Sequence, residues 1–308
     1  MSAKILSFCV KLIAKKVGIQ MKLGFIGTGV MGTGIIINLL KANYPVVVYN
    51  RTKAHAQTVI DRGAVWADTP QAVAEQANIV FSMVGYPQDV EQVYFGKQGL
   101  FKSAKSHSYF IDMTTSTPTL AKKIAELGAR DHLHILDAPV SGGDIGAKKG
   151  TLTIMVGGKR SDYEQLRTIF EVIGTKIHYF GPAGSGQHAK MANQIMIAGT
   201  MTGLTEMLVY AQAAHLDLNQ LLDAVGTGSG ANWSLSNYGP RILAGDYAPG
   251  FYTKHFLKDL RIALDEAKRL HLNLPATTLA EKLYAEMSEK GLGNSGTQAL
   301  IKLYQSTK

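Results

Sequence analysis

The chain has 308 residues, of which 46% are hydrophobic, and this composition excludes an intrinsically disordered protein. The length predicts two domains, or one domain with a large helical addition. The single cysteine, Cys9, excludes a disulfide framework and a cysteine-rich zinc site, so we expect a cytoplasmic protein. No apolar run reaches the roughly 18 residues that a membrane span needs, so we expect no membrane partner.

The net charge of +9 raises the question of a nucleic-acid partner. Four of the lysines fall among the first twenty residues, and no later basic run carries aromatic residues at a useful spacing. We therefore expect no nucleic-acid binding and interpret the remaining charge as favouring anionic small molecules. Residues 1–20 are interpreted as an N-terminal extension without a function, although their pattern also fits an amphipathic helix at a membrane surface.

From Met21 onward, short β-branched runs alternate with stretches of helical periodicity. Helices are expected at 30–42 and 54–62, between the first of these runs. Continuous apolar strands separated by helices predict a parallel sheet that is covered on both faces. The expected strands are 22–27, 45–49, 78–83, 108–112, 134–137, 151–156 and 176–180.

After residue 186 the strand signals disappear, and helices are expected at 187–216, 218–225, 251–270 and 277–290. We predict an α/β Rossmann-type N-terminal domain over residues 21–183, followed by an all-α domain over residues 184–308. The second domain is expected to serve substrate binding and oligomerisation. Because the stretch from Ile195 to Ala211 is largely apolar, we expect a homodimer or a homotetramer.

A glycine-rich motif follows the first expected strand and opens the first expected helix. It reads Gly27-Thr28-Gly29-Val30-Met31-Gly32, which is the G-x-G-x-x-G spacing in the context that a dinucleotide-binding turn requires. Glycines let backbone N–H groups approach a pyrophosphate, and the helix N-terminus then stabilises its charge. The alternative is an ordinary glycine-rich turn between a strand and a helix.

The end of the second expected strand distinguishes the two nicotinamide cofactors. NAD enzymes usually place an acidic residue there, where it binds the ribose hydroxyls, whereas this chain has Asn50, Arg51 and Thr52. Arg51 and the Thr52 hydroxyl can bind a 2′-phosphate, so NADP(H) is favoured and NAD(H) remains possible. The alternative is that Arg51 only begins a solvated helix.

Four blocks occur in a fixed order in the chain: 24–32, 137–143, 184–194 and 257–260. Together they resemble the β-hydroxyacid dehydrogenase family, which includes 3-hydroxyisobutyrate dehydrogenase, tartronate semialdehyde reductase and the glyoxylate and succinic semialdehyde reductases. The 6-phosphogluconate dehydrogenases are more distant members, and the resemblance covers the chain from Met21 onward. It implies a reductase or dehydrogenase in which a small carboxylate substrate is bound and a lysine transfers the proton.

The resemblance implies that Lys190 is the catalytic residue. This lysine lies in an apolar helical stretch, where partial burial would lower its pKa and suit it to proton transfer near neutral pH. The resemblance also implies that the substrate carboxylate binds at Ser141, Gly142 and Gly143, with help from residues on the helical face of Lys190, which are Asn193 and Gln194. The family often has a second asparagine where this chain has Gln194.

Three further residues are implied as cofactor contacts: Val84, Thr115 and Lys258. For Lys258 the alternative is a charge on an exposed helix. No metal site is expected, because His132 and His134, although spaced to share one face of a strand, have no carboxylate or cysteine to complete a ligand set.

These observations predict an NAD(P)-dependent oxidoreductase that interconverts a short β-hydroxy acid and its semialdehyde or keto form by hydride transfer. Two alternatives remain. One is an imine reductase on the same scaffold, although relatives of that type replace the catalytic lysine that this chain retains at position 190. The other is a non-catalytic nucleotide-binding module.

Overall fold

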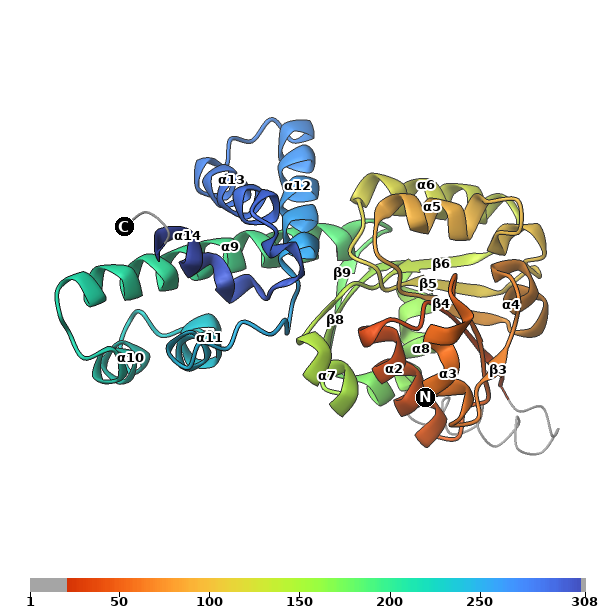
Figure 1. The fold of residues 1–308 in the computed structure, drawn as a ribbon. Helices are drawn as coiled ribbons and strands as arrows, with labels where there is room; N and C mark the ends of the chain where they lie inside the picture. The colour runs from red at the N-terminus through yellow and green to blue at the C-terminus, as the bar shows by residue number, and fades with distance from the viewer. Residues whose placement is uncertain (1–20, 306–308) are drawn as a thin grey trace, which may run out of the picture. The chain divides into compact units, whose positions relative to one another are not determined.

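The computed structural model describes residues 21–305, and these form two compact units that divide between Lys190 and Met191 (Figure 1). The first unit is an α/β fold built on a nine-stranded sheet, and the second is helical. The expected fold class is therefore confirmed. The expected domain boundary near residue 183 stays a prediction, and the interpretation of residues 1–20 concerns residues outside the described range.

Six parallel strands form the main part of the sheet, in the spatial order β3-β2-β1-β4-β5-β6. Strands β1 and β4 lie at its centre, with Phe25 paired to Phe81, and both strands are buried throughout. This burial explains why they read as continuous apolar runs in the sequence. The bounds are β1 Leu23–Ile26, β2 Val46–Tyr49, β3 Val65–Trp66, β4 Ile79–Ser82, β5 Tyr109–Asp112 and β6 His134–Asp137.

The remaining edge of the sheet is not wholly parallel, so the expectation of a parallel sheet is wrong there. The strands at this edge are β7 Val140–Ser141, β8 Leu152–Gly158 and β9 Gly174–Gly181. Strand β8 runs antiparallel to β6 and β7 and parallel to β9. The connection from β7 to β8, residues 142–151, is shorter than the dozen or more residues that a parallel crossover needs.

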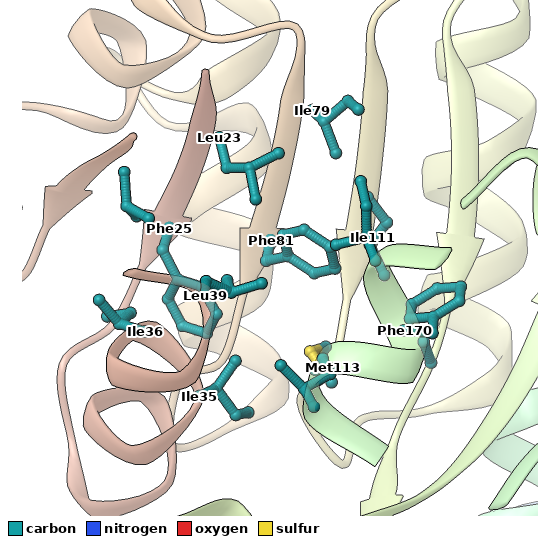
Figure 2. Close-up of a cluster of buried hydrophobic side chains, with 14 of the residues drawn as sticks. Leu23, Phe25, Ile35, Ile36, Leu39, Ile79, Phe81, Ile111, Met113 and Phe170 are labelled. Atoms are coloured by element: carbon teal, nitrogen blue, oxygen red, sulfur yellow. The ribbon is translucent and has the colours of Figure 1, made fainter. Parts of the chain in front are cut away.

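Helices cover both faces of the sheet, because successive side chains of each strand point to opposite faces. One face packs Phe25, Phe81 and Ile111 against helices that include α2 Val30–Lys41, α3 Gln57–Ile60, α7 Gly143–Lys149 and α8 Arg160–Ile173 (Figure 2). The other face packs Val80 and Phe110 against α4 Pro70–Gln76, α5 Pro87–Phe95 and α6 Pro118–Arg130. The expected helix at 54–62 begins as a 3-10 turn, Lys53–Ala56, before α3.

The second unit consists of helices around two larger apolar clusters, one centred on Phe256 and Tyr284 and the other on Met201 and Leu204, and a small one at Met191 and Ile262. The helices are the later part of α9 Ser185–Ala213, then α10 Leu218–Gly226, α11 Trp233–Leu243, α12 Thr253–Arg269, α13 Pro275–Glu289 and α14 Ile301–Gln305. Four of them match the expected ranges closely, whereas α11 and α14 were not expected. Among residues 21–305, no helix has the length and apolar character to cross a membrane.

Candidate cofactor and catalytic site

The glycine-rich motif forms the turn between β1 and α2, and two of its glycines are required by close packing. Gly27 has a φ of +100°, and a Cβ there would collide with the carbonyl oxygen of Met83 in the loop after β4. A Cβ on Gly32 would collide with the carbonyl oxygen of Gly27. These two positions bring the first turn of α2 close to the end of β1.

Gly29, by contrast, faces open space. A Cβ built at this position meets no other atom within 4 Å, and Gly29 and Val30 are both exposed. Gly29 is the N-cap of a 12-residue helix whose first turn carries no acidic residue. Because Gly29 has no side chain, the positively polarised N-terminus of α2 is accessible. This open helix N-terminus fits the pyrophosphate of a dinucleotide.

The residues after β2 are arranged around this turn. The Asn50 Oδ1 accepts from the Thr28 N–H at 3.0 Å, and the Asn50 Nδ2 donates to the Thr52 carbonyl at 2.9 Å. Asn50 thus fixes the glycine-rich turn to the end of β2. Arg51 is 86% exposed, with its Nη1 3.4 Å from the Asp89 Oδ1, so its guanidinium lies at the surface near the start of α5. Whether it binds a 2′-phosphate stays a prediction.

A row of polar residues ends the three neighbouring strands β4, β5 and β6, where Ser82, Asp112 and Asp137 are paired in register. The Ser82 Oγ donates to the Asp112 Oδ1 at 2.9 Å, and the Thr114 N–H donates to the same oxygen at 3.1 Å. Burial raises the pKa of Asp112 to about 6, and these hydrogen bonds limit the rise. The Thr114 Oγ1 accepts from the Val84 N–H at 3.0 Å, which ties the loops after β4 and β5 together.

Asp137 caps the start of α9. Its Oδ1 accepts from the Gly184 N–H at 2.7 Å and its Oδ2 from the Gln187 N–H at 2.8 Å. Burial raises the pKa of this carboxyl, and the backbone N–H groups that it accepts from oppose that rise. Sequence reasoning assigned no role to Asp112, Asp137 or Gln187, although two aspartates that end buried strands were a usable signal.

Lys190 lies one helical turn beyond Gln187 and is only 6% exposed. In the same unit, Ser141 ends β7, and Gly142 and Gly143 follow with φ values of +127° and +62°, a region that side chains disfavour. Gly142 is exposed and is the N-cap of α7. The backbone conformation thus explains why glycines occupy positions 142 and 143. Their contact with a substrate stays a prediction.

In the second unit, α9 and α12 are joined by a chain of polar side chains. The Asn193 Nδ2 donates to the Gln194 Oε1 at 2.7 Å, and the Gln194 Nε2 donates to the Asp259 Oδ2 at 2.7 Å. The Lys258 Nζ lies 3.0 Å from the Asp259 Oδ1. Gln194 and Asp259 are buried and Lys258 is largely so, which excludes the reading of Lys258 as a charge on an exposed helix. Both ends of the Gln194 amide are used within the protein.

No group of three or more histidine, cysteine or acidic side chains within residues 21–305 is placed to hold a metal ion. His134 does have a carboxylate neighbour that the sequence did not indicate, since its Nδ1 lies 3.0 Å from the Asp162 Oδ1. His132 precedes β6 with a φ of +57°, so the expectation that both histidines share a strand face is wrong.

The comparisons with known proteins identify the family of each part of the chain. Residues 22–181 match the family described as the NAD binding domain of 6-phosphogluconate dehydrogenase. Residues 184–304 match the family described as NAD-binding of NADP-dependent 3-hydroxyisobutyrate dehydrogenase. The glycine-rich turn and its fold thus define an NAD(P)-dependent oxidoreductase.

Individual relatives show which kind of NAD(P)-dependent oxidoreductase the chain is similar to. An uncharacterised oxidoreductase of Bacillus subtilis is 50% identical over 92% of this chain and 98% of its own length. The 2-hydroxy-3-oxopropionate reductase of Escherichia coli is 37% identical over 91% of this chain and 96% of its own. The solved structure of Mycobacterium tuberculosis 3-hydroxyisobutyrate dehydrogenase with L-serine has a TM-score of 0.86 at 27% identity, and the match covers 93% of this chain and 99% of that one.

The chain belongs to the β-hydroxyacid dehydrogenase family, and it is an NAD(P)-dependent hydroxyacid dehydrogenase that acts on a CH–OH group. This confirms the expected family, activity and cofactor class. An imine reductase of Myxococcus stipitatus in complex with NADP+ is only 17% identical, with a TM-score of 0.63, and this likeness shows a shared fold alone.

Proposed function

We propose that this dehydrogenase uses NADP(H) to interconvert a short β-hydroxy acid and its semialdehyde, with Lys190 as the general acid and base. One observation carries the proposal. Lys190 is a nearly buried lysine one turn beyond a helix start that is bonded both to a strand-end carboxylate and to the loop after β5. A lysine on a helical turn that is bonded in this way, with little access to water, is better suited to proton transfer than to a solvated surface role.

The cofactor is assigned to the open side of the glycine-rich turn. There the N-terminus of α2 would hold the pyrophosphate, while Arg51 and Thr52 would hold a 2′-phosphate; Val84, Thr115 and Lys258 are the further contacts that we propose. The nicotinamide ring, when bound, supplies or accepts the hydride. The absence of an acidic residue after β2 supports NADP(H) over NAD(H).

The substrate carboxylate is assigned to Ser141, Gly142, Gly143 and Asn193, whose hydroxyl, backbone N–H and amide groups can donate to it. The Lys190 Nζ then gives its proton to the carbonyl oxygen that becomes the hydroxyl, and it takes that proton back in the oxidative direction. Gln194 fixes the amide of Asn193, so we assign it to positioning Asn193 for the substrate.

The names of relatives suggest what the substrate shares. The Escherichia coli relative is named for 2-hydroxy-3-oxopropionate, and a relative from Eubacterium barkeri, 32% identical, for 2-(hydroxymethyl)glutarate. Together with 3-hydroxyisobutyrate, these compounds carry a CH2OH or aldehyde carbon on the atom next to a carboxylate carbon. We propose that this chain acts on the same arrangement of groups.

The activity is tested by assaying the purified enzyme with NADPH and, in turn, glyoxylate, succinic semialdehyde and tartronate semialdehyde, and with NADP+ and 3-hydroxyisobutyrate. Turnover of tartronate semialdehyde or 3-hydroxyisobutyrate, the two compounds with the proposed arrangement of groups, supports the proposal. Absence of turnover with both, in enzyme that binds NADPH, contradicts it, whether or not glyoxylate or succinic semialdehyde is reduced.

The role of Lys190 is tested by Lys190→Ala, which should lower turnover by roughly 10²- to 10⁴-fold, the usual yield of general acid catalysis. NADPH affinity should survive, because the glycine-rich turn is built from other residues. Lys190→Arg should not restore turnover, since a guanidinium keeps its proton at any working pH. Near-normal turnover of folded Lys190→Ala would remove Lys190 from the mechanism.

We further propose that a second copy of the chain covers an apolar groove on α9, giving a homodimer or a homotetramer. The groove has a volume of about 620 Å³, and its lining, which has no charged residue, includes Ile195, Met196, Gly199, Gly203, Leu204 and Leu235. Met196 is 67% exposed in the single chain, which is unfavourable for so large an apolar side chain. A cytoplasmic location belongs to the same proposal and is supported by the single cysteine.

A further inference from the structure

Gln187 makes a two-ended contact with the loop after β5. Its Oε1 accepts from the Ser116 N–H at 3.0 Å, and its Nε2 donates to the Thr114 carbonyl at 2.7 Å. The side chain is fully buried, at 0% exposure, and so spans the backbone on either side of Thr115. A glutamine amide has one acceptor end and one donor end. Here it forms hydrogen bonds with a backbone N–H and a backbone carbonyl, as a neighbouring β-strand would.

The loop that Gln187 holds is fixed from its other side as well. The Thr114 N–H donates to Asp112, and the Thr114 hydroxyl accepts from Val84 in the loop after β4. Thr114 and Ser116 are buried, whereas Thr115 between them is partly exposed. Contacts from β5, from the loop after β4 and from α9 together determine the backbone at Thr115, which is assigned to the cofactor.

The same helical turn carries Lys190. Gln187 and Lys190 are three residues apart and therefore neighbours on one side of α9. The backbone N–H of Gln187 is bonded to Asp137, and a Cβ on Gly186 would collide with the carbonyl oxygen of Met155. This turn thus packs directly against the end of β6 and the middle of β8.

We infer that Gln187 is a positioning residue that sets the distance between the cofactor loop at Thr115 and the proton-transferring Lys190. This inference rests on the proposed function of Lys190 and Thr115. Hydride transfer and proton transfer act on the two atoms of one carbonyl group, so the groups that govern them must be aligned together. Gln187 connects them, because its side chain bonds to the loop at Thr115 and its backbone belongs to the helical turn that carries Lys190.

Two substitutions distinguish the effect of the Gln187 hydrogen bonds from the effect of the space that its side chain fills. Gln187→Met keeps the length of the side chain and removes both hydrogen bonds, whereas Gln187→Glu keeps an acceptor for Ser116 and opposes a carboxylate to the Thr114 carbonyl. The control is Asn38→Leu, which removes a 2.7 Å hydrogen bond from the Asn38 Nδ2 to the Ala147 carbonyl, between α2 and α7 of the same unit. Thermal unfolding of all three variants measures the stability that each loses.

The first readout needs no turnover. Amide hydrogen exchange in the protein without cofactor should be at least about tenfold faster at Ser116 in Gln187→Met, because its N–H loses its partner, and unchanged there in Asn38→Leu. In NADPH titrations, both Gln187 variants should keep the affinity but lose much of the change in nicotinamide fluorescence on binding. Unchanged Ser116 exchange and fluorescence in Gln187→Met would overturn the inference.

The second readout is kinetic. With the best semialdehyde substrate, Gln187→Met should lower kcat by about 10- to 100-fold, the cost of a misplacement of about 1 Å, with little change in KM for NADPH. An equal fall in kcat for Asn38→Leu at equal loss of stability would assign the effect to stability and overturn the inference. If the unsubstituted enzyme reduces no semialdehyde, the proposed function fails, while exchange and fluorescence still decide the role of Gln187.

Discussion

Replacing Gly29 with alanine should separate cofactor binding from folding. Gly29 has a φ of −68°, which alanine adopts freely, and no atom lies within 4 Å of the new methyl group. Alanine restricts the unfolded chain, which stabilises the fold by about 0.4–1 kcal/mol. As an N-cap residue it is less favourable than glycine by up to about 1 kcal/mol. The two effects oppose each other, so the free energy of unfolding should change by less than about 0.5 kcal/mol.

The same methyl group should weaken NADPH binding strongly. It would stand in the open space through which a phosphate oxygen reaches the N–H groups at the start of α2. Loss of one charge-assisted hydrogen bond costs about 1.5–3 kcal/mol. Since each 1.4 kcal/mol is a factor of ten, the Kd for NADPH should rise by roughly 10- to 150-fold.

Gly32→Ala is the matched comparison, because its Cβ would collide with the carbonyl oxygen of Gly27 and lie 3.2 Å from the Phe25 ring. It should lower the free energy of unfolding by about 1–3 kcal/mol, as overpacking does. Urea unfolding without cofactor and NADPH titration by fluorescence measure both quantities for each variant. If Gly29→Ala binds NADPH as tightly as the parent, or unfolds more than 1 kcal/mol more easily, the reasoning about the open turn is refuted.

Three further outcomes follow from other parts of the structure. Arg51→Asp should lower the ratio of kcat/KM for NADPH over NADH, because an exposed guanidinium after β2 is replaced by a carboxylate that repels a 2′-phosphate. Equal efficiencies with the two cofactors in the parent would count against this. Burial raises the pKa of Asp112 from 3.8 to about 6, so the folded protein holds this proton more tightly than the unfolded chain, and stability falls as pH rises through that window. Asp112→Asn should remove this decline, roughly 3 kcal/mol, and a urea series from pH 4 to 7 that keeps the full slope would disprove it. Met196→Glu places a charge in the apolar groove, so it should give a monomeric mass by light scattering at micromolar concentration. Leu279→Glu, on the exposed surface of α13, is the control and should leave the mass unchanged. A monomeric parent would exclude the proposed self-association.

The elements that could be predicted are those whose physical cause is local in the sequence. The glycine-rich turn needs small residues at fixed positions within six residues, so its spacing was sufficient. Strands β1 and β4 were predictable because burial on both faces leaves only apolar residues. The direction of β8 was not predictable in this way, because pairing with β6 leaves no mark on the apolar pattern of either strand.

The positions of the polar side chains around Lys190 depend on contacts between distant parts of the chain. Asp137 bonds to Gly184 and Gln187, and Gln187 bonds to Thr114 and Ser116, across separations of 47 to 73 residues. Periodicity carries no information over such distances, so it could not show which groups these residues bond to, although the aspartates at the ends of buried strands were visible in the sequence. The burial of the Gln194 amide against Asp259 was unpredictable for the same reason.

The carboxylate of Asp137 has a consequence for how the chain is made. During synthesis, residues 134–137 of β6 leave the ribosome well before Gly184 and Gln187, whose N–H groups donate to that carboxylate. Until they emerge, burying Asp137 would leave a desolvated charge without partners, which is strongly unfavourable. The α/β unit therefore buries Asp137 with these hydrogen bonds only after the start of α9 has formed. Its last folding step waits for the first turn of the helix that the other unit continues, and a fragment ending at residue 181 lacks that step altogether.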